Sequence, residues 1–240
     1  MYAEVSPSLQ YSNHALAPDQ AIKLLERARI RVIPVYLVAP DAQLPYVEAL
    51  AVDYPVAVKI AAVDIAHKAA VGGVVLGCRG PDEVIAARDR ILADVGANMC
   101  SQGRDVVLSG VYVQSMVRGD LEVVLGIQRD PDFGPLVAFG LGGWAVETWA
   151  DLNFRRPPLR ARDVDSILCS TRAGALLSRH TDRFARALQD LRAGIEGLGE
   201  LALELEDSLI ELEANPLVVN AAGAFAVDAI GLTSGSYPNL

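Results

Sequence analysis

One lysine interrupts an apolar segment near residue 60, and its surroundings restrict what the chain can fold into. The segment Val56 to Ile60 reads VAVKI, and its small and β-branched residues are typical of a buried strand. An unpaired ammonium inside such a strand is costly, so Lys59 must either reach solvent along its own stem or meet an anion. The strand alone leaves both alternatives open. A nucleotide phosphate would be a suitable anion.

The residues that follow this strand supply further chemistry. His67 and Lys68 offer a titratable imidazole and a second cation, and Gly72-Gly73 lets the backbone approach a ligand closely. His67 is also explained by a hydrogen bond to a backbone carbonyl beside a turn, so its chemical role depends on the rest of the chain.

Charge and composition limit the classes of partner. The chain has 240 residues, 52% of them hydrophobic, which is enough to bury a substantial core in one domain or two packed lobes. Its formal net charge of -9 argues against a nucleic-acid backbone or an anionic membrane as the main partner. A phosphate site would therefore be local.

The cysteines and the apolar runs predict a cytoplasmic protein. Cys78, Cys100 and Cys169 are widely spaced and form no CxxC pair, which favours reduced structural thiols over disulfides or a zinc site. The N-terminus has no signal-peptide pattern, and no apolar run reaches the ~20 residues that span a bilayer.

Periodicity and turn signals predict an α/β chain in two lobes, with residues 1–17 as a loose leader, 18–109 as the first lobe and 110–240 as the second. Within the first lobe we expect helices at 18–29, 45–52 and 82–95, strands at 32–38, 56–61 and 74–78, and a polar break at 97–105. The second lobe should contain an antiparallel meander of strands at 110–116, 121–128 and 136–140, a long helix at 179–205, and strands at 208–212 and 224–230 around an Asn215-Pro216 turn.

Oxygen-bearing side chains gather near the C-terminal end. Glu211, Glu213, Asn215 and Asp228 lie on neighbouring predicted segments, and Mg²⁺ is commonly held by one or two such groups together with waters and substrate phosphates. The alternative is structural, since Asn-Pro can begin a turn and Asp228 can cap a strand.

Several motifs occur in a linked order that resembles a known family. The chain is similar to the ATP-grasp subunit or domain of nucleoside-diphosphate-forming acyl-CoA synthetases, such as ADP-forming acetyl-CoA synthetase, with succinyl-CoA synthetase β subunits as distant relatives. The motifs are VAVKI (56–60), DIAHKAAVGGVVLG (64–77), VYVQSM (111–116), LEVVLGIQRDPDFGPLVAFGLGG (121–143), ELEANPLVV (211–219) and AVDA (226–229). The chain departs from the family pattern at Ala62-Val63, Ala69-Ala70, Gln128, Arg156 and Glu213.

The resemblance implies an ATP-grasp fold and a role for each matching residue. ATP or ADP would bind with Mg²⁺ between the lobes, and phosphate would pass through a phosphohistidine. The implied catalytic residue is His67; the nucleotide-binding residues are Lys59, Lys68, Gln114, Ser115, Met116 and Glu122; the metal ligands are Asn215, Asp228 and Glu213; and the loop over the phosphates or at the partner contains Gly140, Gly142, Gly143 and Glu147.

The resemblance also implies a partner. The chain lacks a Rossmann-type glycine fingerprint and the length for CoA-binding and ligase domains, so we expect a CoA-binding α subunit, or fused CoA-binding domains, in an active hetero-oligomer. The predicted reaction moves phosphate between a nucleotide and a partner-bound acyl phosphate. Two alternatives stay open: a non-catalytic nucleotide-sensing or metabolite-sensing domain of a protein acetyltransferase, and an ATP-grasp carboxylate-amine ligase.

Overall fold

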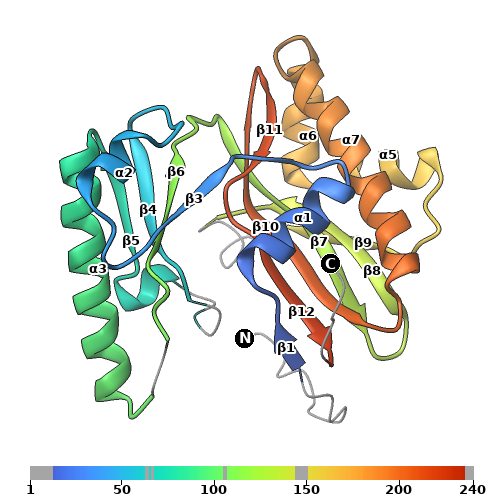
Figure 1. Cartoon of the computed structure of the whole chain (residues 1–240). Helices are drawn as coiled ribbons and strands as arrows, with labels where there is room; N and C mark the ends of the chain where they lie inside the picture. Colours follow the sequence, from blue (N-terminus) through green and yellow to red (C-terminus); the bar gives the residue numbers. More distant parts are fainter. Residues whose placement is uncertain (1–12, 63–64, 66–67, 105–106, 144–150, 236–240) are drawn as a thin grey trace.

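The chain folds into two lobes, each built on its own β-sheet. A computed structural model describes residues 13–62, 65, 68–104, 107–143 and 151–235. Within these residues the strands form a sheet of eight strands and a sheet of four (Figure 1), and each sheet has its own hydrophobic core. This arrangement confirms the predicted α/β class.

The small lobe contains the four-stranded antiparallel sheet. Its strands lie in the order β3 (Val35–Val38), β6 (Val111–Ser115), β4 (Val56–Ile60) and β5 (Val74–Cys78), with α2 (Leu44–Glu48), α3 (Pro81–Ser101) and the 3₁₀ helix η1 (Lys68–Val71). One face of β4, formed by Val56, Val58 and Ile60, packs in a core with α3. Since side chains alternate along a strand, Ala57 and Lys59 point to the other face.

Helix α3 extends beyond its predicted end at residue 95. It begins at Pro81, with Asp82 and Glu83 in its first turn, as the sequence indicates. It then continues to Ser101 through part of the predicted polar break, because Met99 lies four residues after the buried Val95 and extends the same apolar face.

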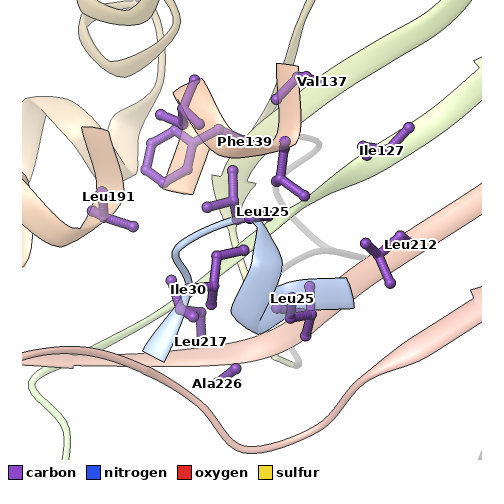
Figure 2. Packing of buried hydrophobic residues seen from close by; sticks show 14 of the residues in the cluster. Leu25, Ile30, Leu125, Ile127, Val137, Phe139, Leu191, Leu212, Leu217 and Ala226 are labelled. Carbon is purple, nitrogen blue, oxygen red and sulfur yellow. The ribbon is translucent and has the colours of Figure 1, made fainter. Parts of the chain in front are cut away.

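The large lobe contains the eight-stranded sheet and the remaining helices. The main strand order is β1 (Asn13–Ala15), β12 (Ile230–Ser234), β10 (Leu209–Asn220), β7 (Leu121–Asp130), β8 (Gly134–Leu141) and β9 (Leu152–Arg155), while β11 (Gly223–Ala226) pairs with β10 and β2 (Arg31–Val32). Its helices are α1 (Pro18–Arg27), α5 (Ala161–Cys169), α6 (Arg172–Arg179) and α7 (Thr181–Glu204). Figure 2 shows how Phe139, Leu125 and Leu191 bring β8, β7 and α7 together in the core.

Strand pairing divides the chain differently from the predicted boundaries at 17/18 and 109/110. The segment 13–32 belongs to the large lobe: β1 pairs with β12, β2 pairs in parallel with β11, and α1 buries Leu24 and Leu25 in the large core. Strand β6, predicted as the start of the second lobe, instead lies between β3 and β4. The chain therefore crosses from one lobe to the other after β2 and again after β6.

The C-terminal strands correct another prediction. Strand β10 runs through Asn215-Pro216 without turning, and its register against β7 shifts between Ala214 and Leu217. A β-bulge tolerates a proline that cannot donate to the ladder, so the Asn-Pro signal marks an irregularity within one strand. The predicted strand 224–230 is divided into β11 and β12, and Asp228 lies in the connection between them.

No helix in the described part of the chain is long and apolar enough to cross a membrane.

Candidate functional site

A cavity of about 670 Å³ lies between the two lobes and is lined by residues of both. The small lobe contributes residues of β4, β5, β6 and η1, and the large lobe contributes residues of β7, β10 and the β11–β12 connection. The predicted site residues among its lining are Lys59, Lys68, Gln114, Ser115, Met116, Glu122, Glu213, Asn215 and Asp228. The fold thus brings together nine predicted residues that lie between positions 59 and 228 of the sequence.

The small-lobe wall follows from strand register. Ala57 of β4 lies opposite Gln114 of β6, and Lys59 lies opposite Val74 of β5. Side chains at these positions share the cleft face because alternate residues of a strand point the same way. Val74, Leu76 and Ala57 add apolar surface beside the polar groups, and Leu76 is 64% exposed. Such a wall is suitable for one face of a flat, partly apolar ligand.

The Lys59 ammonium is fixed by two hydrogen bonds. Its Nζ donates to the Gln114 side-chain oxygen at 3.0 Å and to the Val227 carbonyl at 2.5 Å. Burial lowers the pKa of Lys59, and the nearby charge of Lys68 acts in the same direction, while Asp228 opposes it. The ammonium thus bonds to protein acceptors and does not simply extend to solvent, although Lys59 as a whole is only partly buried. An anion at this position between the lobes would restore its usual preference for the charged form.

Lys68 bridges the lobes through an ion pair with a predicted metal ligand. Its Nζ lies 3.1 Å and 3.2 Å from the two carboxylate oxygens of Asp228, and the whole residue is only 8% exposed. The Asp228 Oδ1 also accepts a hydrogen bond from the Ala229 backbone amide at 3.0 Å. Two cations and one carboxylate consequently meet at one end of the cavity.

The large-lobe wall depends on a close approach at Gly143. Its backbone amide donates to Asn215 Oδ1 at 3.0 Å, and its φ of +59° lies in the left-handed region. A Cβ placed there would lie 1.9 Å from Glu122 Oε2. Glycine at position 143 therefore allows Glu122 and Asn215 to face the cavity side by side.

The donor set fits a magnesium ion that shares its coordination with phosphate. Glu213, Asn215 and Asp228 present carboxylate and amide oxygens to one cavity, and Mg²⁺ favours such hard ligands while keeping waters or substrate oxygens. Among the described residues no three of histidine, cysteine, aspartate or glutamate form a cluster that could hold a metal alone. A site completed by phosphate oxygens is consistent with both observations.

The remaining predicted site residues either fall outside the described part of the chain or do not line the cavity. His67 and Glu147 fall outside the described residues, as do Trp144 and Trp149. Gly140 lies within β8, where a Cβ would clash with the Asp151 carbonyl at 1.8 Å, so it permits the close approach of the chain leading into β9. Gly142 similarly packs against the backbone of Val123. Neither lines the cavity, and their part in a loop over the phosphates or at the partner stays a prediction.

Sequence reasoning did not identify every group in the site. The Val227 carbonyl, which accepts a hydrogen bond from Lys59, is outside the predicted set. Gln114 is predicted to bind the nucleotide, whereas its side chain bonds to Lys59 in the structure. The alternation of VAVKI could have placed Ala57 and Lys59 on one face. Which residue of β6 lies across from these positions, however, depends on the register between β4 and β6, and the local sequence does not determine that register.

Comparison with known proteins agrees with this architecture. Residues 8–230 match the ATP-grasp domain family. The chain belongs to the ATP-grasp family. Within the family, it is 31% identical to the β subunit of ADP-forming acetate–CoA ligase I from Pyrococcus furiosus, over 94% of this chain and 95% of that subunit. It is also 31% identical to ADP-forming acetate–CoA ligase I from Archaeoglobus fulgidus, over 94% of this chain and 32% of that protein. The chain thus spans about a third of this longer ligase and nearly all of the separate β subunit.

Solved structures place the same fold in this ligase group. Acetyl-coenzyme A synthetase 1 from Ca. Korarchaeum cryptofilum, in complex with coenzyme A and Ca-AMPCP, matches with a TM-score of 0.80 at 28% identity, over 92% of this chain and 93% of that one. Another structure of that enzyme contains Mg-AMPPCP and has its phosphohistidine segment pointing towards the nucleotide-binding site; it matches with a TM-score of 0.70 at 26% identity, over the same shares. This ATP-grasp chain therefore belongs with the β subunits and domains of ADP-forming acyl-CoA ligases.

Proposed function

We propose that this ATP-grasp chain is the nucleotide-binding part of an ADP-forming acyl-CoA ligase and moves phosphate between ATP or ADP and a partner-bound acyl phosphate. The observation that carries the proposal is the cavity between the lobes, which joins two lysines of the small lobe to the oxygen ligands of the large lobe. The relatives compared above are ligases or synthetases, which favours this function over the acetyltransferase regulator and the carboxylate-amine ligase.

The nucleotide would lie across both walls of the cavity. The base would rest on the apolar surface near Leu76 and border the backbone of residues 114–116, while Lys59 and Lys68 would bind the phosphates. Glu122 would accept a hydrogen bond from the nucleotide. Asn215 and Asp228, with Glu213 close by, would hold Mg²⁺, which when bound neutralises phosphate charge during transfer.

His67 is the proposed phosphate carrier, next to Lys68 in the sequence. A lone pair of its neutral imidazole would attack the γ-phosphorus of ATP. The N–P bond forms as the bond to the bridging oxygen breaks, ADP leaves with that electron pair, and the proton on the other ring nitrogen passes to solvent. Attack on the phosphohistidine phosphorus by an acyl carboxylate oxygen would then form the acyl phosphate as the N–P bond breaks, and the ring would take a proton back from solvent to restore the neutral imidazole.

The proposed reaction also requires a part that binds CoA. We infer a CoA-binding α subunit, or fused CoA-binding domains on one polypeptide, because the Pyrococcus relative is a β subunit and the Archaeoglobus relative is about three times as long. Acyl-group recognition would lie largely with that partner in a hetero-oligomer. A cytoplasmic location completes the proposal.

The direct test is phosphorylation of the isolated chain. Incubation with γ-labelled ATP and Mg²⁺ should give protein-bound label that is acid-labile and base-stable, and a His67→Asn variant should carry none. A His14→Asn variant provides a matched control, because His14 lies on β1 and does not line the cavity. Absence of label, or equal label in His67→Asn, would refute the phosphohistidine assignment.

A further inference from the structure

The side chain of Gln114 contacts the partly buried ammonium of Lys59. Gln114 is 2% exposed and lies on β6, directly opposite Ala57 and diagonal to Lys59 on the cleft face. The small side chain of Ala57 leaves room for the two longer side chains to meet above the strands. The Gln114 Oε1 accepts the hydrogen bond from Lys59 Nζ at 3.0 Å.

The same glutamine is fixed from its other end by the segment that connects the lobes. Gln114 Nε2 donates to the Ile33 carbonyl at 2.8 Å, and Ile33 lies between β2 of the large lobe and β3 of the small lobe. The Ile33 backbone amide in turn donates to the Ala226 carbonyl at 3.0 Å. Because Lys59 donates to Val227, which follows Ala226, the hydrogen bonds close a ring through both lobes.

Donor counting shows what this ring leaves for a ligand. A lysine ammonium has three N–H donors. Lys59 uses two of its donors in the hydrogen bonds to Gln114 and Val227. Lys59 and Gln114 also line a small cavity of about 30 Å³, which has space for about one water molecule. The two hydrogen bonds to protein acceptors determine where the remaining donor points before any ligand arrives.

We propose that Gln114 is a positioning residue that holds the Lys59 ammonium in its anion-binding orientation. This inference depends on the proposed function, in which Lys59 binds the nucleotide phosphates. An ammonium that is already fixed loses little side-chain freedom when it binds phosphate, so preorganisation raises affinity without a contact between the Gln114 side chain and the ligand. The benefit should be specific to ligands that carry phosphates.

The test compares nucleotide binding in Gln114→Met with binding in Lys59→Met and in the double variant, using calorimetry with ATP and Mg²⁺ and competition with adenosine. Methionine keeps the length of glutamine and removes its hydrogen bonds. Gln114→Met should weaken ATP binding by roughly tenfold and leave adenosine binding unchanged. In the Lys59→Met background the same change should have no effect, because there is no ammonium left to position.

A second measurement separates positioning from general damage to the fold. Trace labelling of lysines with acetic anhydride should modify Lys59 faster in Gln114→Met, because a lost acceptor favours the neutral amine, while Lys23 should react at its wild-type rate. Gln102→Met is the matched control, since Gln102 forms its side-chain hydrogen bond with Asn98 on the surface. If Gln114→Met does not fold, Gln114→Asn, whose shorter amide cannot span both partners, should give the same selective loss.

The outcomes distinguish this inference from the proposed function. Weak ATP binding in Lys59→Met together with normal binding in Gln114→Met overturns the positioning role alone. Equal losses of ATP and adenosine binding in Gln114→Met also overturn it, since they indicate damage to the base site. Unchanged ATP binding in Lys59→Met overturns both the role of Lys59 and the inference that depends on it.

Discussion

Lys68 and a divalent metal compete for the same carboxylate, and this competition gives a prediction with an unusual sign. Lys68 Nζ lies 3.1 Å from Asp228 Oδ1, and Asp228 is a proposed magnesium ligand. Replacing Lys68 with methionine preserves a buried, unbranched side chain but removes its charge. We expect Lys68→Met to bind a divalent metal more tightly than the wild type in the absence of nucleotide, and to bind ATP more weakly.

The size of the gain follows from the geometry of the ion pair. At 3.1 Å two unit charges attract by about 5 kcal/mol at an effective dielectric constant of ~20. The Asp228 side chain is 30% exposed, so solvent screening and the desolvation of both groups reduce the net value to about 1–3 kcal/mol. Release of Asp228 from this pair should therefore raise metal affinity by roughly 5- to 150-fold.

Electron paramagnetic resonance of free Mn²⁺, a common substitute for Mg²⁺, measures metal binding directly, and calorimetry measures ATP binding. Lys23→Met is the matched control, because Lys23 forms an exposed pair with Asp19 on α1. Adding Asp228→Asn to Lys68→Met should abolish the gain. Unchanged or weaker Mn²⁺ binding by Lys68→Met would refute the competition, and unchanged ATP binding would remove Lys68 from the phosphate site.

Two further predictions concern Gly143 and Lys59. Gly143→Ala should weaken ATP binding and lower the free energy of unfolding by about 1 kcal/mol, because the new Cβ would displace Glu122 and strain a backbone φ of +59°. Calorimetry measures the binding and urea denaturation measures the stability. The control is Gly96→Ala, at an open position in α3, which should leave ATP binding unchanged. Burial lowers the pKa of Lys59, and a bound phosphate would raise it again. ATP affinity should therefore be full below the pKa that Lys59 has in the nucleotide-free protein, and it should decline as the pH rises through that pKa. Titrations across that pH range should show a decline that Lys59→Met lacks, and an identical decline in the variant would assign it to another group.

The sequence predicted the elements whose signals are local. VAVKI predicts a strand because its residues are small or β-branched, and Pro81-Asp82 predicts the start of α3 because proline suits the first helical turn. The sequence also named every polar side chain that lines the cavity, but the roles came from the resemblance between linked motifs. Composition and spacing alone left Lys59 and Asp228 with structural alternatives.

The errors concern relations between segments that are distant in the chain. Nothing within residues 111–115 shows that β6 inserts between β3 and β4, because that position depends on tertiary packing. The Asn215-Pro216 signal predicted a turn, yet pairing with β7 and β12 keeps β10 extended through a bulge. The ion pair between Lys68 and Asp228 spans 160 positions, so only the folded chain shows it.

The proposed function requires that a magnesium nucleotide binds between the two lobes of this chain. A crystal structure with Mg²⁺ and the non-hydrolysable analogue AMPPCP tests it most directly. We predict density for the triphosphate within hydrogen-bonding distance of Lys59, with the metal at Asn215 and Asp228 and the base beside residues 114–116. A nucleotide bound outside the cavity that Lys59, Glu122 and Asp228 line, or an empty cavity at saturating nucleotide, would contradict the claim.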